Sequence, residues 1–250
     1  YKRQVVACEP HRERTGDAVA GLDWGVNTYA TLCTGPMEFS EIENDRLWQQ
    51  EQEGIKEQQR AMSAALRGKR SRRATRARRL IAKRYRKLAN RRKDRAHKLA
   101  AKLAGAHALI VTEKLTVKNM TASAAGTVAE PGKNVRQKAG LNREILDTTP
   151  GSFLSLLTTK AEEAGGKVIL VDTRKYKPSQ TCPVSGKVKK KRLDERSHTL
   201  PDGQVIGRDQ AAAWVLHNIG LNLLQQHAPH AAGDRREPAE PKAETAARAD

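Results

Sequence analysis

Three carboxylates in the sequence stand where predicted strands end or where a predicted helix begins. Asp23 closes a first strand, Glu113 ends a central strand, and Asp209 lies in the first turn of the last helix. Carboxylates from neighbouring strand ends and a helix start can converge at one edge of a sheet, and hard divalent cations such as Mg²⁺ prefer these oxygen ligands. Two such ions, about 3.5–4 Å apart, can activate a water and stabilise the leaving oxygen of a phosphodiester. The three residues are therefore candidate metal ligands and catalytic groups.

Each of these carboxylates also has an ordinary structural explanation. Asp209 at a helix start complements the positive end of the helix dipole. Glu113, followed by Lys114, is consistent with an exposed ion pair of little consequence. Asp23 stands two residues before Gly25 and suits a turn, although a glycine there also lets a backbone and a phosphate approach closely. The residues alone leave both explanations open, so the elements around them decide.

The surrounding sequence predicts the elements that these carboxylates need. Residues 17–35 have β-prone residues on both sides of a turn, and residues 105–115 form a short apolar run typical of a buried strand. Residues 150–172 predict a helix with Ser152 as its N-cap and then a buried strand, and a further helix closes the domain. This order indicates an α/β domain with a mixed sheet, which we place at residues 17–226.

A long helical hairpin is predicted between the strand pair at residues 17–35 and the strand at residues 105–115. Residues 41–104 contain no proline and two glycines, and Trp48, Ile55 and Met62 recur at intervals of seven. The same helical spacing continues beyond Gly68. We expect two long antiparallel helices that meet near this glycine.

The positive charge of the chain is concentrated in this hairpin. The formal net charge is +19, and residues 67–102 contain 18 Lys or Arg against one acid. Because the helices offer almost no acid to pair with, a merely solvated helix pair is disfavoured and a polyanion is the expected partner. Only 4% of all residues are aromatic, which favours contact with backbone phosphates over base stacking. The candidate nucleic-acid-binding residues are Arg70, Arg72, Arg73, Arg76, Arg79, Lys83, Arg84, Arg86, Lys87, Arg91, Arg92 and Lys93.

The remaining sequence excludes several classes of protein. Three widely spaced cysteines argue against a disulfide framework and fit a reducing compartment. No apolar run approaches the roughly 18 residues of a membrane span, so we expect a cytoplasmic protein with no membrane contact. Residues 116–141 are expected to form a loop and residues 227–250, which lack large apolar side chains, a disordered tail. Residues 1–16 are expected to form a lead-in from a preceding domain, because the sequence begins at Tyr1.

Several ordered motifs resemble those of a known family. The stretches "GLDWGVNTYATL", "LIVTEKLTVKNM" and "GRDQAAAWVLHNI" are similar, in order and spacing, to the three RuvC motifs of TnpB-like proteins. These are transposon-encoded relatives of the type V CRISPR effectors. The stretches "ANRRKDRAHKLAAKLA" and "KAEEAGGKVILVDTRKYKPSQTC" extend the resemblance, which covers roughly residues 19–220.

The resemblance implies an RNase H-like (RuvC) fold into which the basic hairpin is inserted. It also implies that Asp23, Glu113 and Asp209 form a catalytic triad that binds two Mg²⁺ ions, with Asp23 bridging both and the other two holding one each. Trp24 is bulkier than the aliphatic residue usual at that place in the family. The implied partners are a guide RNA, a target DNA and their RNA–DNA heteroduplex.

The resemblance also places a degenerate zinc-ribbon-like segment at residues 175–206. The four ligand positions of the ribbon correspond to Cys182, Ser185, Thr199 and Asp202, so that three thiolates are missing. Since structural zinc sites are normally closed by four strong ligands, we expect no zinc here, and an irregular site that adds His198 would be weak. The basic residues 187–196 offer a further contact with nucleic acid.

Three functional hypotheses follow. The first is an RNA-guided, Mg²⁺-dependent DNA endonuclease, or the C-terminal nuclease half of one. The second is an RNA-guided nucleic-acid-binding protein that is catalytically weak or inactive, which the incomplete cysteine site favours and the intact triad opposes. The third is a stand-alone RNase H-like junction nuclease, against which the long basic hairpin argues.

Overall fold

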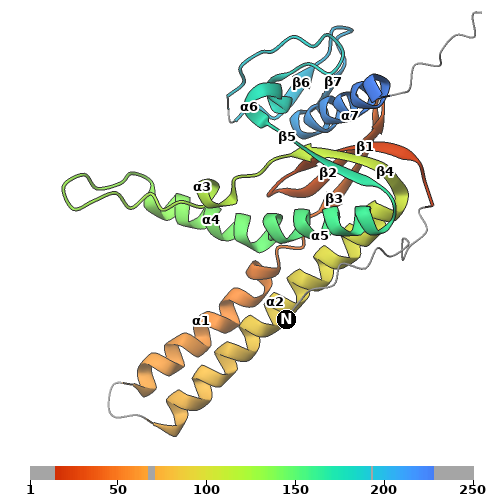
Figure 1. The fold of residues 1–250 in the computed structure, drawn as a ribbon. Helices are drawn as coiled ribbons and strands as arrows, with labels where there is room; N and C mark the ends of the chain where they lie inside the picture. The colour runs from red at the N-terminus through yellow and green to blue at the C-terminus, as the bar shows by residue number, and fades with distance from the viewer. Residues whose placement is uncertain (1–14, 67–70, 193, 228–250) are drawn as a thin grey trace, which may run out of the picture.

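A five-stranded mixed sheet forms the centre of the molecule (Figure 1). The computed structural model describes residues 15–66, 71–192 and 194–227, so Arg70, Cys8 and most of the predicted lead-in and tail lie outside the described residues. The strand order is β3-β2-β1-β4-β5, with β1 antiparallel to β2, β2 antiparallel to β3, and β4 parallel to both β1 and β5. The strands span β1 Ala18–Trp24, β2 Thr28–Gly35, β3 Glu38–Glu43, β4 His107–Glu113 and β5 Lys167–Val171. The prediction of a mixed α/β fold is confirmed.

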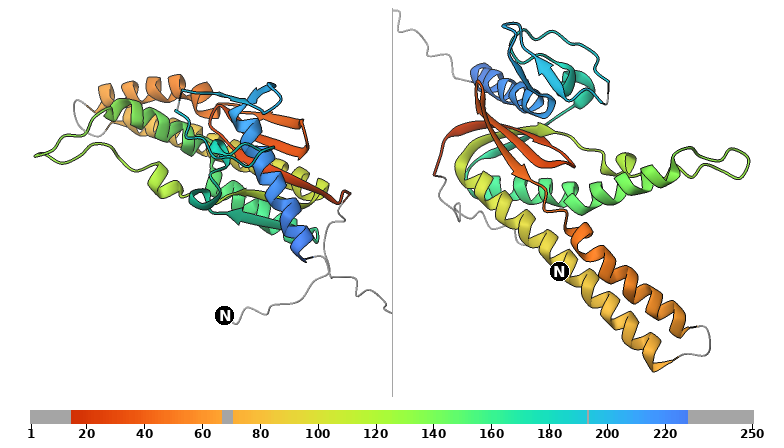
Figure 2. Two further views of the ribbon diagram at one scale, coloured as in Figure 1. Left: turned by 90° about the horizontal axis from the view of Figure 1, so that it is seen from above. Right: turned by 180° about the vertical axis from the view of Figure 1, so that it is seen from behind.

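Helices cover both faces of this sheet, as Figure 2 shows. The helix α7, Arg208–His227, packs on one face against β1, β2 and β4. The other face is covered by α2, Arg72–Ala106, and α5, Pro150–Glu163, which also pack against each other. The buried side chains of β1 alternate accordingly, because successive residues of a strand point to opposite faces.

Two long helices project from the sheet as an antiparallel pair (Figure 1). The first, α1, spans Leu47–Ala65 and packs along the N-terminal half of α2. Ile55 and Leu88 are buried between them, and the rings of Trp48 and Tyr85 stack with centroids 6.3 Å apart. The predicted start of this hairpin at residue 41 is wrong, because the edge strand β3 occupies that stretch.

Three further expectations differ from the structure. The predicted loop at 116–141 contains the short helix α3, Val117–Met120, and the beginning of α4, Val135–Thr148. Helix α5 begins at Pro150, so Ser152 lies inside its first turn instead of capping it. The strand β5 is largely exposed or half-buried, because it forms an edge of the sheet.

A small lobe follows β5 and leads into α7. It contains α6, Thr173–Tyr176, a 3₁₀ turn at Pro178–Gln180, and a two-stranded ribbon of β6, Ser197–Thr199, and β7, Val205–Gly207. We call residues 173–207 the lobe. In the part of the chain that the structure describes, no helix is both long and apolar enough to cross a membrane.

Candidate active site and nucleic-acid interface

Asp23 and Glu113 occupy adjacent places in two neighbouring strands. The register pairs Leu22 of β1 with Thr112 of β4, so the next residue along each strand is a carboxylate. Because side chains alternate along a strand and residues level with each other in a parallel pair share a face, both carboxylates project from the same side of the sheet. Two of the three predicted site residues are thus brought together by strand register alone.

Helix α7 covers this side of the sheet. Val19 and Val111, which share the face of Asp23 and Glu113, pack in one cluster with Leu216 of α7. The first turn of α7 contains the third carboxylate, that of Asp209. The packing of α7 therefore directs the third predicted site residue toward the strand ends that bear the other two.

A glycine in β1 lets α7 approach the sheet closely. A Cβ atom at Gly21 would lie 2.0 Å from the carbonyl oxygen of Ala213 and 2.3 Å from the backbone nitrogen of His217. A Cβ at Gly220 would likewise lie 2.7 Å from a methyl group of Val19. Our sequence analysis overlooked Gly21, although a glycine within a strand pattern is a known sign of close backbone approach.

The three carboxylates act on one another electrostatically. Burial raises the pKa of Asp23 well above its usual value, and the negative charges of Glu113 and Asp209 raise it further, while the Arg208 guanidinium opposes the shift. Burial also raises the pKa of Glu113. The Nε atom of Arg208 lies 3.6 Å from Oδ1 of Asp209. One cationic side chain thus lies at the edge of a cluster whose charge is predominantly negative.

The chemistry of this cluster fits a hard divalent cation. Oxygen ligands of like charge at the end of a buried strand pair are stabilised by such an ion, which removes their mutual repulsion. Among the described residues, no group of three His, Cys, Asp or Glu side chains is arranged to hold a metal ion. The structure brings the three residues to one site without showing coordination.

The other glycine that we singled out has a different role. A Cβ at Gly25 would lie 2.6 Å from the carbonyl oxygen of Thr28, and the Gly25 N–H donates to the Tyr29 carbonyl at 3.3 Å. Gly25 is thus required by the tight turn between β1 and β2. This requirement explains the glycine without a phosphate.

The cations of α2 divide into a paired and an unpaired group. Arg84, Lys87 and Arg91 surround the buried carboxylate of Glu51 in α1, at 3.1, 3.3 and 3.8 Å. Burial alone would raise the pKa of Glu51, but hydrogen bonds and charges from Lys87 and Arg84 lower it overall. These three predicted phosphate ligands therefore hold the hairpin together.

A fourth predicted phosphate ligand is tied into a junction of three helices. Arg92 lies 2.6 Å from the carboxylate of Asp147 in α4, whose side chain is 1% exposed. The same carboxylate accepts from the backbone N–H of Trp48 in the first turn of α1 at 3.0 and 3.1 Å. Sequence reasoning missed Asp147, because it lies between the predicted loop at 116–141 and the predicted helix at 150–172, in a stretch to which no element was assigned.

Arg73, also predicted to bind nucleic acid, is exposed but lies on another side of α2. Six of the remaining cations form an exposed face along this helix. Arg72, Arg79, Arg86 and Lys93 recur at intervals of seven residues. Arg76 and Lys83 lie four residues after Arg72 and Arg79, so all six side chains share one side of the helix. They extend over 21 residues, or about 32 Å at 1.5 Å per residue. All six are exposed, and none forms an ion pair with another described residue. The face consists of Arg72, Arg76, Arg79, Lys83, Arg86 and Lys93.

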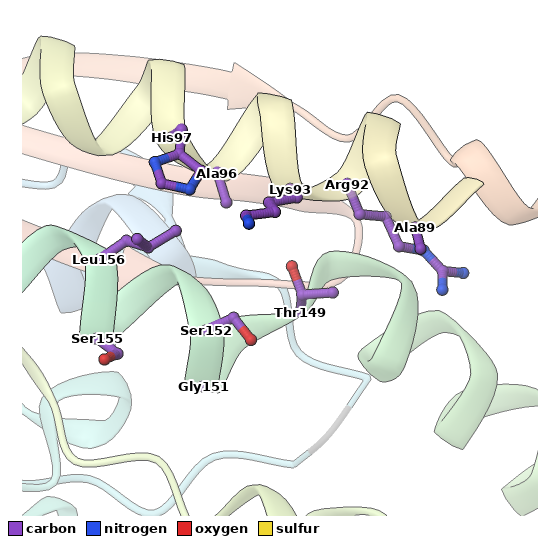
Figure 3. A pocket seen from close by; sticks show the side chains of 10 residues that line it. All are labelled: Ala89, Arg92, Lys93, Ala96, His97, Thr149, Gly151, Ser152, Ser155 and Leu156. Carbon is purple, nitrogen blue, oxygen red and sulfur yellow. The ribbon is translucent and has the colours of Figure 1, made fainter. Parts of the chain in front are cut away.

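The exposed face ends at a groove between α2 and α5. This groove has a volume of about 600 Å³, and Lys93 and His97 of α2 line it opposite Ser152 and Ser155 of α5 (Figure 3). It lies on the α2–α5 side of the sheet, whereas Asp23 and its partners face α7. The groove is therefore separate from the candidate active site.

The donor set of the lobe does not fit zinc. Cys182 is buried and accepts from the backbone N–H of Ser185 at 3.5 Å. Thr199 and Asp202 are exposed, and the Asp202 carboxylate accepts from the N–H of Gln204 at 3.0 Å. One thiol and one histidine, His198, leave too few strong ligands for a structural zinc site.

Comparisons with known proteins give family matches over two parts of the chain. Residues 3–124 match a family described as "Probable transposase" (OrfB_IS605), and residues 151–216 match the family "Cas12f1-like, TNB domain". Together the two matches take in all three carboxylates. The chain is thus related to the TnpB-like proteins and to the type V CRISPR effectors, and the resemblance seen in its motifs is confirmed.

Two curated relatives align with most of this chain. It is 37% identical over 169 residues to an Escherichia coli K12 protein named "Putative RNA-guided DNA endonuclease InsQ", an alignment that covers 68% of this chain and 40% of the relative. It is 29% identical over 205 residues to a Streptomyces pristinaespiralis protein named "Putative RNA-guided DNA endonuclease", an alignment that covers 82% of this chain and 46% of the relative. The chain therefore spans less than half the length of these relatives.

Solved structures agree on the fold. A structure described as "Cryo-EM structure of the Cas12f1-sgRNA-target DNA complex" superposes with a TM-score of 0.54 at 13% identity, covering 85% of this chain and 40% of that chain. A "Cryo-EM structure of CRISPR-Cas12f Ternary Complex" gives 0.55 at 15% identity, with coverage of 86% and 41%. At these identities the likeness concerns the fold.

Proposed function

We propose that this chain is the nuclease region of an RNA-guided DNA endonuclease with an RNase H-like (RuvC) fold. The observation that carries the proposal is the adjacent register of Asp23 and Glu113 on the face over which α7 presents Asp209. In this proposal residues 17–226 form the nuclease domain, and α1 and α2 are an insertion between its third and fourth strands. The names of the curated relatives support DNA as the substrate.

Asp23, Glu113 and Asp209 are the residues that would hold two Mg²⁺ ions. Bound Mg²⁺ supplies a water activated for attack on phosphorus and charge that stabilises the leaving oxygen. The chain itself contributes the fixed spacing of its ligands, since Asp23 and Glu113 are set by strand register and Asp209 by the packing of α7. Arg208 limits the charge of the cluster, because its guanidinium lies beside Asp209 and opposes the raised pKa of Asp23.

The exposed face of α2 would bind the backbone of the guide RNA or of its heteroduplex with target DNA. Six unpaired cations along about 32 Å match a run of phosphates and give affinity without reading bases. The groove at the end of this face, which Lys93 also lines, adds His97 and the hydroxyl groups of two serines (Figure 3). Recognition would then follow backbone geometry, as in other RNA-guided effectors.

The decisive experiment compares Asp23→Asn with the exposed control Asp94→Asn. DNA cleavage is measured with the chain bound to its guide RNA in Mg²⁺ and in EDTA. We expect Asp23→Asn to lose about a thousandfold in rate, as expected when several kcal/mol of metal-derived stabilisation is removed, while RNA binding is unchanged. Undiminished Mg²⁺-dependent cleavage by Asp23→Asn contradicts the proposed site.

A second function is that of an RNA-guided binding protein without cleavage, because the exposed face of α2 would bind phosphates whether or not the carboxylates hold a metal ion. Tight binding of guide RNA by the wild-type chain, with no nicking of any DNA in Mg²⁺ or Mn²⁺, supports this alternative over the nuclease. Activity on four-way junctions without RNA supports a junction nuclease instead.

A further inference from the structure

The lobe keeps the turn geometry of a metal-binding ribbon at both of its ends. At the first end, the carbonyl of Cys182 accepts from the N–H of Gly186 at 2.9 Å, and Gly186 has a φ of 67°. At the second, the carbonyl of Leu200 accepts from the N–H of Gly203 at 3.0 Å, and Gly203 has a φ of 87°. Both turns are thus formed in a segment that lacks the four strong ligands of a structural metal site.

A lysine side chain contacts the ribbon strand β6, which leads into the second turn. Lys191 is half-buried, whereas its neighbours Lys189 and Lys190 are exposed. Its ammonium group donates to the carbonyl oxygen of Ser197 at 3.3 Å and forms a close contact with Nδ1 of His198. The cation thus contacts the ribbon strand β6 at two consecutive residues.

The buried groups of the lobe respond to this cation. Burial lowers the pKa of Lys191. The pKa of His198 is also lowered, mainly by burial and to a smaller extent by the positive charge of Lys191. Burial alone would raise the pKa of Cys182, but hydrogen bonds from Ser185 and Val184 and the charge of Lys191 lower it overall. Lys191 is therefore electrostatically linked to the first turn through Cys182 and to the second through His198.

We propose that the ammonium group of Lys191 replaces the metal ion at the centre of this lobe, which keeps its shape without zinc. Lys191 donates to Nδ1 of His198, so the imidazole is neutral and carries its proton on Nε2. That Nε2 atom is buried and has no hydrogen-bond partner among the described residues, so the ring is oriented from its Nδ1 side. The ammonium group thus contacts the Ser197 carbonyl and the His198 imidazole, and its charge acts on the Cys182 thiol.

The lobe in turn holds the first turn of α7. Cys182 and Leu200 pack in one cluster with Trp214 of α7, and Asn218 of α7 donates to the Pro183 carbonyl at 2.8 Å. The backbone N–H of Arg208 donates to the carbonyl of Arg196 at 2.8 Å. Lys191 is thus a positioning residue for the turn that contains Asp209, and this last step rests on the proposed function.

The first test measures metal in the wild-type chain. We expect no stoichiometric zinc after purification in zinc-supplemented buffer, and a melting temperature that EDTA leaves unchanged. In a spectrum of ¹⁵N-labelled histidine, His198 should show the shifts of a neutral ring protonated on Nε2. About one zinc ion per chain, or a melting temperature that falls with EDTA, overturns the proposal whatever the catalytic activity.

The second test compares Lys191→Met with the matched control Lys190→Met, an exposed lysine next to it in sequence. Lys191→Met leaves a buried imidazole nitrogen and a carbonyl without their donor, so we expect its melting temperature to fall by about 5 °C, against no change in the control. Equal melting temperatures for the two variants overturn the proposal.

The positioning role has its own readout. Well below both melting temperatures, Lys191→Met should need several-fold more Mg²⁺ than Lys190→Met for half-maximal cleavage, because Asp209 is less firmly placed. An unchanged Mg²⁺ requirement removes the positioning role and leaves a structural one. If the wild-type chain cleaves no DNA but contains no zinc and loses stability in Lys191→Met, the proposed function fails while the role of Lys191 in the lobe stands.

Discussion

The carboxylate of Asp147 joins Arg92 of α2 to the start of α1, although 55 residues separate the two charged side chains in sequence. Because Asp147 is 1% exposed, its carboxylate makes its polar contacts with this partner and with the N–H of Trp48 instead of with water. The pair fixes the angle at which the hairpin leaves the sheet. It also removes Arg92 from the set of cations that are available to nucleic acid.

Removing Arg92 should therefore affect stability. In Arg92→Ala the Asp147 carboxylate stays buried without its cation, and since Arg92 itself is partly exposed we expect a loss of about 2–3 kcal/mol in the free energy of unfolding. Urea unfolding measures it. Arg79→Ala, on the exposed face, is the control and should change stability by less than about 0.5 kcal/mol. Similar losses in both variants would show that the division of the α2 cations is wrong.

Removing two residues of the exposed face should instead affect binding. Arg79→Ala combined with Arg86→Ala removes two phosphate contacts, so the slope of log K against log salt should fall by about two for duplex or heteroduplex. Replacing the paired residues Arg84 and Lys87 should leave that slope nearly unchanged. Filter binding across a salt series measures both. A larger change of slope in the paired double variant would contradict the assignment.

Substituting Gly21 should displace α7. In Gly21→Ala the new methyl group meets backbone atoms of Ala213 and His217, which cannot move without the helix, so we expect a loss of about 3 kcal/mol or more and the loss of DNA cleavage. Gly140→Ala in α4 is the control, because a Cβ there has no atom within 4 Å and alanine favours a helix by about 0.5–1 kcal/mol. Thermal unfolding and cleavage assays measure the two effects. Normal cleavage by Gly21→Ala would refute the role given to α7.

The stability contribution of Asp23 should depend on pH and on Mg²⁺. Its pKa in the folded chain is raised by burial and by Glu113 and Asp209, with Arg208 opposing, so folding favours the protonated form. The associated stability is complete below the unfolded pKa and is lost as the pH rises through the folded pKa. In EDTA, Asp23→Asn should therefore become more stable than wild type as the pH rises.

Added Mg²⁺ should reverse this difference. The ion favours the ionised carboxylates, so it should raise the melting temperature of the wild-type chain and leave that of Asp23→Asn almost unchanged. Melting temperatures across a pH series, with and without Mg²⁺, test both statements, with Asp94→Asn as the control. A wild-type chain whose stability ignores Mg²⁺ would argue against the metal site.

The sequence predicts those elements whose signal is local. The strands that carry Asp23 and Glu113 are short apolar runs with turn residues beside them, and the helix after Gly207 has a clear apolar pattern. The edge strand β3 was missed because its sequence, "EFSEIE", is half acidic, as edge strands exposed to solvent permit. Helix α4 was missed because a glycine-rich stretch precedes it and few of its residues are buried.

The same limit applies to the site. The three carboxylates were predicted from their positions at the ends of elements. Their closeness depends on Gly21, whose role cannot be recognised until the helix that packs against it is known. Likewise, charge counting predicted a basic surface on α2, yet it could not separate paired from unpaired cations. The partners Glu51 and Asp147 lie 33 and 55 residues from the arginines that they bind, and only the tertiary structure brings them together.

The contact of Gly21 with α7 is made between backbones. Side chains in a core can be exchanged for others of similar volume at little cost in stability. Because no side chain separates β1 from α7 at this point, the spacing of the carboxylates does not depend on which apolar residues fill the neighbouring core. Substitutions elsewhere in the core should therefore alter the geometry of the site less than a substitution at Gly21.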